Sequence, residues 1–487
     1  MRRLLVLAAA LAILVPAGVA AAFPNTEPLA AKQWYLEQVQ AWDFWDTMPS
    51  LYPVRVAVVD SGVDGSNPDL TGRIVAAKSF VGGSPYKDTQ GHGTFVAGEI
   101  AANSGNALGI SGLAFNARLV VAKVVDASGS VPVSAEVAGI RWAVDQGARV
   151  INLSLGGVRD PLDQQDDTYS PLEQAAIDYA YSKGVVVVAA VGNGPQSPSE
   201  PWSYAAYPAA LPHVIGVSAV RENGSVPGYS NRDAVYNDVA APGDAMFSTI
   251  PTNLLSSEPT CANHPWSDCG PDELRNAIGT SFAAPLVSAA AALILGQDPT
   301  LSPDQVSWLI ERSADDATAS TGCGACTPGR DALTGWGRLD VAGALTLLQS
   351  GGLPTPDRYE PNDDAGPWSH ALPPLPRTVQ ASLDYWDDNV DVYRVTLKKG
   401  QALYARLTPE VAANVKLALW PPGTKRVEGL DLKTVRAAQS RRVGGQDRLA
   451  FRAQKTGTYY LEAKLVSLAH DPVQYRLALA RVSRRSP

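Results

Sequence analysis

Between positions 55 and 350 the hydrophobic residues form short apolar runs separated by longer amphipathic segments. The apolar runs are rich in β-branched residues and are continuous rather than alternating, which is typical of strands covered on both faces. The predicted strands are Arg55–Asp60, Arg118–Asp126, Arg149–Leu155, Val185–Val191 and His213–Val220. The predicted helices are His92–Ala102, Ser134–Gln146, Pro171–Lys183, Thr280–Gln297 and Pro303–Ser313. This alternation predicts an α/β fold, a doubly wound and mostly parallel sheet with helices on both faces.

The pattern changes after Leu348. The segment Ser350–Pro356 has the Gly- and Pro-rich composition of a linker. Beyond it come short runs of alternating polarity, Asp391–Leu397, Ala402–Leu407 and Thr458–Ala463, which predict a small all-β sandwich. We therefore expect an α/β domain over residues 23–349 and a β-sandwich domain over residues 357–487, joined by the linker 350–356.

The first 22 residues have the pattern of a secretory signal peptide. Arg2 and Arg3 precede the apolar run Leu4–Val15, and the alanines at 20–22 offer a small-residue cleavage site. The run is shorter than the ~20 apolar residues that a membrane span needs. We expect a secreted, extracellular protein, with an uncleaved N-terminal anchor as the alternative.

Composition supports globular domains of unequal charge. Hydrophobic residues make up 45% and charged residues 18%, which excludes a disordered or fibrous chain. The net charge is −8, yet the segment Val392–Pro487 carries 19 Lys or Arg against 6 Asp or Glu. A solvated basic face is the plainer interpretation, and binding of an acidic polymer or surface is the other. We expect a monomer with no nucleic-acid partner.

The four cysteines of an exported chain should be oxidised. Cys261 and Cys269 flank a polar stretch, and Cys323 and Cys326 form a close pair. A zinc site at the second pair would need a second Cys-x-x-Cys or a His pair, which the sequence lacks. We expect two local disulfides, although four cysteines allow three pairings.

Four polar residues stand at the ends of predicted elements, where α/β proteins gather functional side chains. Asp60 ends a buried strand, where an unpaired carboxylate is costly. His92 lies between two glycines at the first turn of a helix, and Asn193 follows another strand. Ser281 opens an apolar helix whose N-terminus favours an anion, and Pro285 is tolerated there because early helical positions need no backbone donor. Taken singly, each of the four also fits an ordinary capping, turn or structural role.

Taken together, the local sequences around these residues resemble those of the subtilisin-like serine proteases, the subtilases. The motifs are Val58-Val-Asp-Ser-Gly62, Gly91-His-Gly-Thr-Phe-Val-Ala-Gly98, Ser154-Leu-Gly-Gly157, Ala190-Val-Gly-Asn193 and Gly279-Thr-Ser-Phe-Ala-Ala-Pro285. The resemblance runs from about Gln33 to Leu348. It implies a catalytic triad of Asp60, His92 and Ser281, with Asn193 in the oxyanion hole.

The same resemblance implies a substrate cleft and a calcium site. Ser154, Leu155 and Gly156 would line the cleft with Ala190 and Gly192, their backbone pairing with an extended peptide. Subtilases often bind calcium where the segment Asn67–Leu70 meets the loop Asn103–Ile110. Asp69 and Asn106 supply hard oxygen donors there, so calcium is a candidate structural cofactor; a solvated loop is the alternative.

The C-terminal part resembles the bacterial pre-peptidase C-terminal domain, through Asp357-Arg-Tyr-Glu-Pro-Asn-Asp-Asp364, Asp391-Val-Tyr-Arg-Val395 and Gly457-Thr-Tyr-Tyr460. Glu360, Asn362 and Asp363 could hold a calcium ion, but the sequence favours a solvated acidic turn. The domain would adhere to a substrate or surface, or assist export.

Three other functions compete with peptidase activity. A catalytically silent binding protein would not need all three triad residues. A lipase of the α/β-hydrolase type would need a Gly-x-Ser-x-Gly motif, which is absent, and another order of the triad. An adhesin would act through its C-terminal sandwich. The sequence therefore favours a secreted serine endopeptidase of broad specificity, whose substrates are proteins or peptides.

Overall fold

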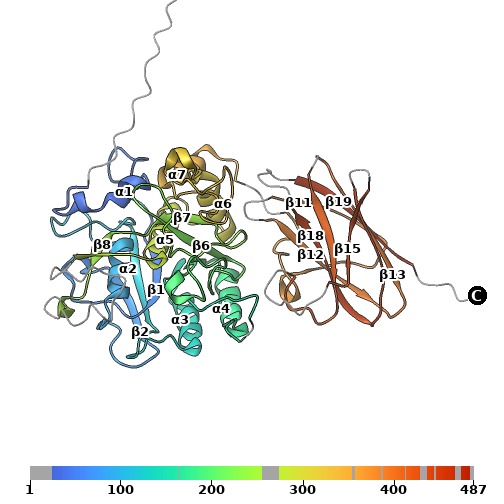
Figure 1. The fold of residues 1–487 in the computed structure, drawn as a ribbon, viewed down its shortest axis with the longest axis horizontal. Helices are drawn as coiled ribbons and strands as arrows, with labels where there is room; N and C mark the ends of the chain where they lie inside the picture. Colours follow the sequence, from blue (N-terminus) through green and yellow to red (C-terminus); the bar gives the residue numbers. More distant parts are fainter. Residues whose placement is uncertain are drawn as a thin grey trace, which may run out of the picture.

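The N-terminal apolar runs form one seven-stranded parallel sheet (Figure 1). The computed structural model describes residues 25–163, 165–254, 274–353, 357–384, 388–411, 413–427, 436–443, 446–466 and 473–482. In spatial order the strands are β2 (Ile74–Ser79), β3 (Ala117–Lys123), β1 (Val54–Asp60), β4 (Val150–Leu153), β5 (Val186–Ala190), β6 (Val214–Val220) and β7 (Val239–Pro242). The expected strands are present; β2 and β7, at the two edges, escaped the sequence analysis.

Helices cover both faces of this sheet, as the alternating pattern predicts. One face carries α3 (Val133–Asp145) and α4 (Pro171–Ser182); the other carries α2 (His92–Ala101), α5 (Thr280–Gln297), α6 (Pro303–Ser313) and α7 (Val341–Ser350). Along β1, Val56 and Val58 join the core of the second face, whereas Ala57 and Val59 join that of the first. Burial of both faces explains why the strands have continuous apolar sequences.

Helix α5 runs through the centre of the domain. Among the described residues it is the one helix long and apolar enough to cross a membrane, and 89% of it is buried inside the protein. Its residues pack against α2 and against β1, β4, β5, β6 and β7. The continuous apolar sequence therefore reflects burial on every side of the helix.

Smaller elements complete the N-terminal domain. Helix α1 (Trp34–Gln38) precedes the sheet, and β8 (Met246–Thr249) pairs antiparallel with β9 (Leu274–Ala277). Cys323 and Cys326 form a disulfide as expected. The expected pair Cys261 and Cys269, like the signal segment 1–22, lies outside the described residues.

The C-terminal domain is a sandwich of two five-stranded sheets around one apolar core. The first sheet contains β10 (His370–Ala371), β12 (Val390–Leu397), β18 (Gly457–Leu465), β14 (Val415–Trp420) and β15 (Ala438–Gln439). The second contains β11 (Arg377–Leu383), β19 (Val473–Val482), β13 (Ala402–Pro409), β17 (Gln446–Arg452) and β16 (Arg441–Val443). In β11 and β13 buried positions, which are apolar, alternate with exposed ones, which agrees with the alternating pattern.

The two domains meet through aromatic rings. Trp368 of the sandwich lies 5.3 Å from the ring of Tyr181 and 5.0 Å from that of His213 (ring-centroid distances). His213 stacks on Tyr181 at 3.8 Å. Burial, assisted by the nearby charge of Arg426, lowers the pKa of His213 to about 3. His213 is therefore a neutral structural residue of this interface.

Candidate active site

The candidate residues gather at one edge of the parallel sheet. Asp60 is the last residue of β1, Ser154 directly follows β4, and Asn193 lies three residues beyond β5. These three strands are neighbours in the sheet, so their carboxyl ends open on the same side. Helices α2 and α5, which pack against each other, begin at this edge with His92 and with Thr280 just before Ser281.

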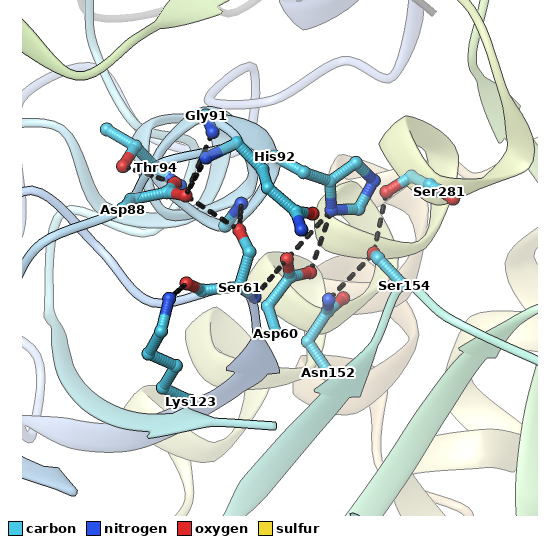
Figure 2. Close-up of polar contacts among 12 residues, drawn as sticks. Asp60, Ser61, Asp88, Gly91, His92, Thr94, Lys123, Asn152, Ser154 and Ser281 are labelled. Atoms are coloured by element: carbon cyan, nitrogen blue, oxygen red, sulfur yellow. Dashed lines mark hydrogen bonds and ion pairs between the residues drawn. The ribbon is translucent and has the colours of Figure 1, made fainter. Parts of the chain in front are cut away.

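His92 and Asp60 form the central polar contact of the site (Figure 2). The Nδ1 atom of His92 lies 2.9 Å from each carboxylate oxygen of Asp60, and Asp60 is 2% exposed. Because a carboxylate accepts hydrogen bonds, Nδ1 carries the proton and Nε2 remains free to accept one. The ring of His92 also lies 5.2 Å from that of Phe282, the residue after Ser281.

Asp88, which the sequence analysis missed, holds the start of α2 in place. Its carboxylate is fully buried and accepts hydrogen bonds from the backbone N–H groups of Gln90, Gly91 and Thr94. It also accepts from the hydroxyl of Ser61 at 2.9 Å. These bonds satisfy helix donors that would otherwise lack partners, and the negative charge suits the helix N-terminus.

Two glycines let α2 approach β1. Gly91 has φ of 92°, a left-handed conformation that side chains disfavour. A Cβ atom on Gly93 would lie 2.2 Å from the backbone oxygen of Gly62 and 3.1 Å from Cβ of Asp60. The glycines on either side of His92 therefore permit the short contact between His92 and Asp60.

Opposing charges act on the pKa of His92. Burial alone would lower it, but the charge and hydrogen bond of Asp60, together with the charge of Asp88, outweigh burial and raise it above its ordinary value. The site therefore stabilises the protonated imidazole, which is the state that a general base reaches during catalysis.

A series of hydrogen-bonded polar side chains holds the backbone at Ser281. The position of Pro285 in the helix differs from the one expected. Pro285 is the sixth residue of α5, not an early one, so it removes the hydrogen bond that the carbonyl of Ser281 would accept. The hydroxyl of Ser154 replaces that donor at 2.6 Å. Asn152 donates to Ser154 at 2.8 Å and accepts from Ser288 at 2.9 Å. Asn152, Ser154 and Ser281 are visible together in Figure 2.

The carboxamide of Asn193 has a defined orientation. Its oxygen accepts from the backbone N–H of Thr280 at 3.0 Å and from the Thr280 hydroxyl at 3.1 Å. The amide nitrogen is therefore not used by Thr280, and its one described hydrogen-bond partner is Gln196 Oε1 at 3.4 Å. The side chain thus keeps an N–H donor at the edge of the cleft.

One cavity of about 370 Å³ is lined by the candidate catalytic residues and by the residues expected in the substrate cleft. Its lining includes Asp60, His92, Ser281 and Asn193 together with the five residues expected in the substrate cleft, Ser154, Leu155, Gly156, Ala190 and Gly192. Among the described lining residues, Asp60 and His92 are the only ones with an acidic or basic side chain. The rest of the wall consists of small, apolar or uncharged polar residues.

The expected calcium residues, Asp69 and Asn106, contact each other near the C-terminal end of α2. Asn106 Nδ2 donates to Asp69 at 3.0 Å, and the backbone N–H of Ile110 donates to the other oxygen of Asp69 at 2.9 Å. Glu27, which the sequence analysis missed, accepts from the backbone N–H groups of Gly105 and Asn106. Its second oxygen is buried and has no hydrogen-bond partner among the described residues. This oxygen-rich set fits a hard cation.

A second group of acids lies in the C-terminal domain, close to α6. Carboxylate oxygens of Glu360, Asp363 and Asp388 all lie within 4.8 Å of one another, a spacing that could hold a metal ion. Asn362 is fully buried, which contradicts the expectation of a solvated turn. Burial and the charges of Asp357 and Asp304 raise the pKa of Glu360 to about 7.

Comparison with known proteins identifies the family to which the chain belongs. The model of the subtilase family matches residues 53–337, more than half of the chain. The chain belongs to the subtilase family. It is 40% identical to subtilisin DY of Bacillus licheniformis over 254 residues, covering 52% of this chain and 80% of that protein. It is 35% identical to thermitase of Thermoactinomyces vulgaris over 294 residues, covering 60% of this chain and 91% of that protein.

A solved protease structure has a similar fold. A protease of Pseudoalteromonas arctica aligns with a TM-score of 0.53 and 28% identity, covering 66% of this chain and 98% of that one. These relatives make the chain a serine endopeptidase of subtilisin type. The region that the family model matches lies within the N-terminal domain, so it says nothing of the C-terminal sandwich.

Proposed function

We propose that this subtilase is a secreted endopeptidase of broad specificity in which Ser281 is the nucleophile and His92 the general base. The observation that carries the proposal is the pairing of His92 Nδ1 with both oxygens of Asp60, on the wall of the cavity that Ser281 also lines. Nε2 of His92 would take the proton of Ser281 as its hydroxyl attacks the peptide carbonyl. Asp60 would hold the ring in the correct tautomer and stabilise the imidazolium that forms.

Asn193 would stabilise the oxyanion of the tetrahedral intermediate. Its carboxamide oxygen is already held by Thr280, so its N–H group is the part available to the developing charge. The intermediate collapses to an acyl-enzyme and releases the amine, which takes its proton from His92. Water, activated by the same imidazole, then hydrolyses the acyl-enzyme.

The cavity wall supports broad specificity. A pocket that selects a charged side chain presents the opposite charge, and the described lining holds no Lys, Arg or Glu and no Asp besides Asp60. The segments Ser154–Gly156 and Ala190–Gly192 would pair with an extended substrate backbone, an interaction that reads no side chain. The substrates would accordingly be unfolded or extended segments of many proteins.

Calcium would act as a structural cofactor, at Asp69, Asn106 and Glu27 and at Glu360, Asp363 and Asp388. In both places buried oxygens lack enough hydrogen-bond donors, and a bound divalent cation would neutralise them. Export would follow from the N-terminal signal pattern, and the enzyme would act as a monomer.

The first experiment compares the wild type with Ser281→Ala. The wild type should hydrolyse casein and react with a fluorescent fluorophosphonate, which labels activated serines, whereas the variant should do neither. Circular dichroism would verify that the variant is folded. Labelling of a folded Ser281→Ala variant at the wild-type rate would refute the assignment of the nucleophile.

The second experiment tests the oxyanion role of Asn193. Asn193→Ala should lower kcat by ~10²–10³-fold, the range found when a subtilisin loses one such donor. KM should change little, because the oxyanion exists only in the transition state. An unchanged kcat with a raised KM would instead assign Asn193 to substrate binding.

A further inference from the structure

The second sheet of the C-terminal sandwich carries three arginines side by side on adjacent strands. Arg406 of β13 is directly opposite Arg448 of β17, and Arg448 is directly opposite Arg441 of β16. All three are exposed and point outward from the sheet, because directly opposed residues share a face. We call Arg406, Arg441 and Arg448 the arginine row.

Folding alone does not account for the arginine row. Like charges directly opposite each other on a sheet destabilise it. The outward positions of these strands, where described, hold no Asp or Glu, and none of the three arginines forms an ion pair with another described residue. Among the described residues, the arginine row forms one side-chain hydrogen bond, from Arg448 to Gln446 at 3.2 Å.

A wide, shallow groove surrounds the arginine row. It has a volume of about 1270 Å³, and none of its lining residues belongs to the catalytic domain. Ala450, Ala478 and Ala480 form a floor without bulky side chains beside the row. Tyr404, which is 48% exposed, lies opposite Ala450 and presents an aromatic face within the groove.

We propose that this groove binds an anionic polysaccharide whose sugar units carry carboxylates. Neighbouring strands are ~4.8 Å apart, so the row presents guanidinium groups at a regular spacing that suits a polymer with one carboxylate per sugar. Guanidinium groups bind carboxylates in a bidentate manner. The alanine floor leaves room for sugar rings, and Tyr404 offers an aromatic surface for one of them to stack on.

Other polyanions fit the groove less well. Proteins that bind single-stranded nucleic acid stack successive bases on several aromatic side chains, and Tyr404 is the only aromatic residue among those lining the groove. A membrane-binding face inserts large apolar side chains, and among the described side chains of this face Tyr404 is again the only large exposed apolar one. A polysaccharide requires neither feature. It would hold the peptidase on an acidic matrix and leave the catalytic cleft accessible.

The test measures binding of the full-length protein to soluble oligogalacturonate by isothermal titration calorimetry. The methyl ester of the same oligosaccharide, which lacks the charges, is the matched ligand control. We expect binding of oligogalacturonate only, weakened by added salt because exposed charges are screened over ~10 Å at 0.1 M. The triple variant Arg406→Gln, Arg441→Gln, Arg448→Gln should bind at least about tenfold more weakly.

A second triple variant separates the arginine row from general charge. Lys398→Gln, Lys399→Gln, Lys455→Gln removes the same charge from exposed turns outside the groove and should keep affinity within about twofold. Casein hydrolysis should remain at the wild-type rate in both variants, which verifies folding. The arginine variant should also melt no lower than the wild type, since it relieves cross-strand repulsion.

Four results would overturn the proposal. One is equal loss of affinity in both triple variants, and another is equal binding of the methyl ester. The third is absence of oligogalacturonate binding. The fourth is tighter binding of double-stranded DNA or of phosphatidylglycerol vesicles, which would identify a different class of partner.

Discussion

Buried carboxylates occur in both domains of this subtilase, but their surroundings differ. At the cleft, both oxygens of Asp60 and both oxygens of Asp88 accept hydrogen bonds from N–H or O–H groups. In the sandwich, Glu360 Oε1 and Asp388 Oδ1 are buried without a partner among the described residues, and like charges surround them.

The difference indicates how each group of acids is neutralised. Hydrogen-bond donors of the protein itself stabilise the charges of the cleft, which can therefore serve catalysis without an ion. Carboxylates that crowd together without donors need a cation or protons. Buried acids thus have a proposed catalytic role at the cleft and a predicted metal-binding role in the sandwich.

The largest expected effect comes from exchanging one acid for its amide in each domain. Asp60→Asn should lower kcat by ~10⁴-fold, because an amide can no longer hold His92 in the tautomer that accepts the serine proton. Asp388→Asn removes the same charge and should leave kcat/KM within about twofold of the wild type. Steady-state kinetics on a peptide substrate would measure both. Similar kinetics of the two variants would show that the comparison between the domains is wrong.

An intermediate effect is expected when calcium is removed. The measurement uses the Ser281→Ala variant, which cannot digest itself. In calorimetry a chelator should lower the Tm of a domain that binds calcium by about 5–10 °C, the effect of losing a ligand that is present at ~100 times its Kd. Asp388→Asn should abolish the calcium dependence of the sandwich, yet raise its Tm in chelator by relieving repulsion.

The matched variant Asp69→Asn should alter only the calcium response of the catalytic domain. If the chelator leaves every transition unchanged in the parent protein, neither group of oxygens binds calcium and the metal proposal fails.

The smallest effect is a shift in the pH profile. His92 must be neutral to act as the base, and its environment raises its pKa above the ordinary value of 6.5. Activity should therefore rise with pH, with its midpoint above 6.5. The pH dependence of kcat/KM measures this midpoint. A midpoint below 6.5 would mean that burial outweighs the charges of Asp60 and Asp88.

The contribution of His92 to stability changes with pH in the opposite direction to activity. A raised pKa means that folding favours the protonated imidazole, so this contribution is full below the unfolded pKa and is lost as pH rises through the folded value. The pH at which His92 becomes an active base is thus the pH at which it stops contributing to stability.

Much of the catalytic domain could be predicted because its signals are local. Continuous apolar runs identify buried strands, and helices α5 and α6 begin and end where the sequence predicts. The positions of Asp60, His92, Asn193 and Ser281 at element ends follow from the same pattern, since parallel strands bring their carboxyl ends to one edge. The edge strands β2 and β7 are weaker signals, because β2 is only partly buried and β7 is four residues long.

The sequence by itself determined the classes of element, their order and the four candidate catalytic residues. Tertiary structure alone decided their partners: that Asp88 holds α2, that Ser154 replaces the donor lost at Pro285, and that three arginines lie in one row. The physical reason is distance along the chain. Ser154 and the carbonyl of Ser281 are 127 residues apart, and strand register, which sets cross-strand neighbours, is fixed by packing of the whole sheet.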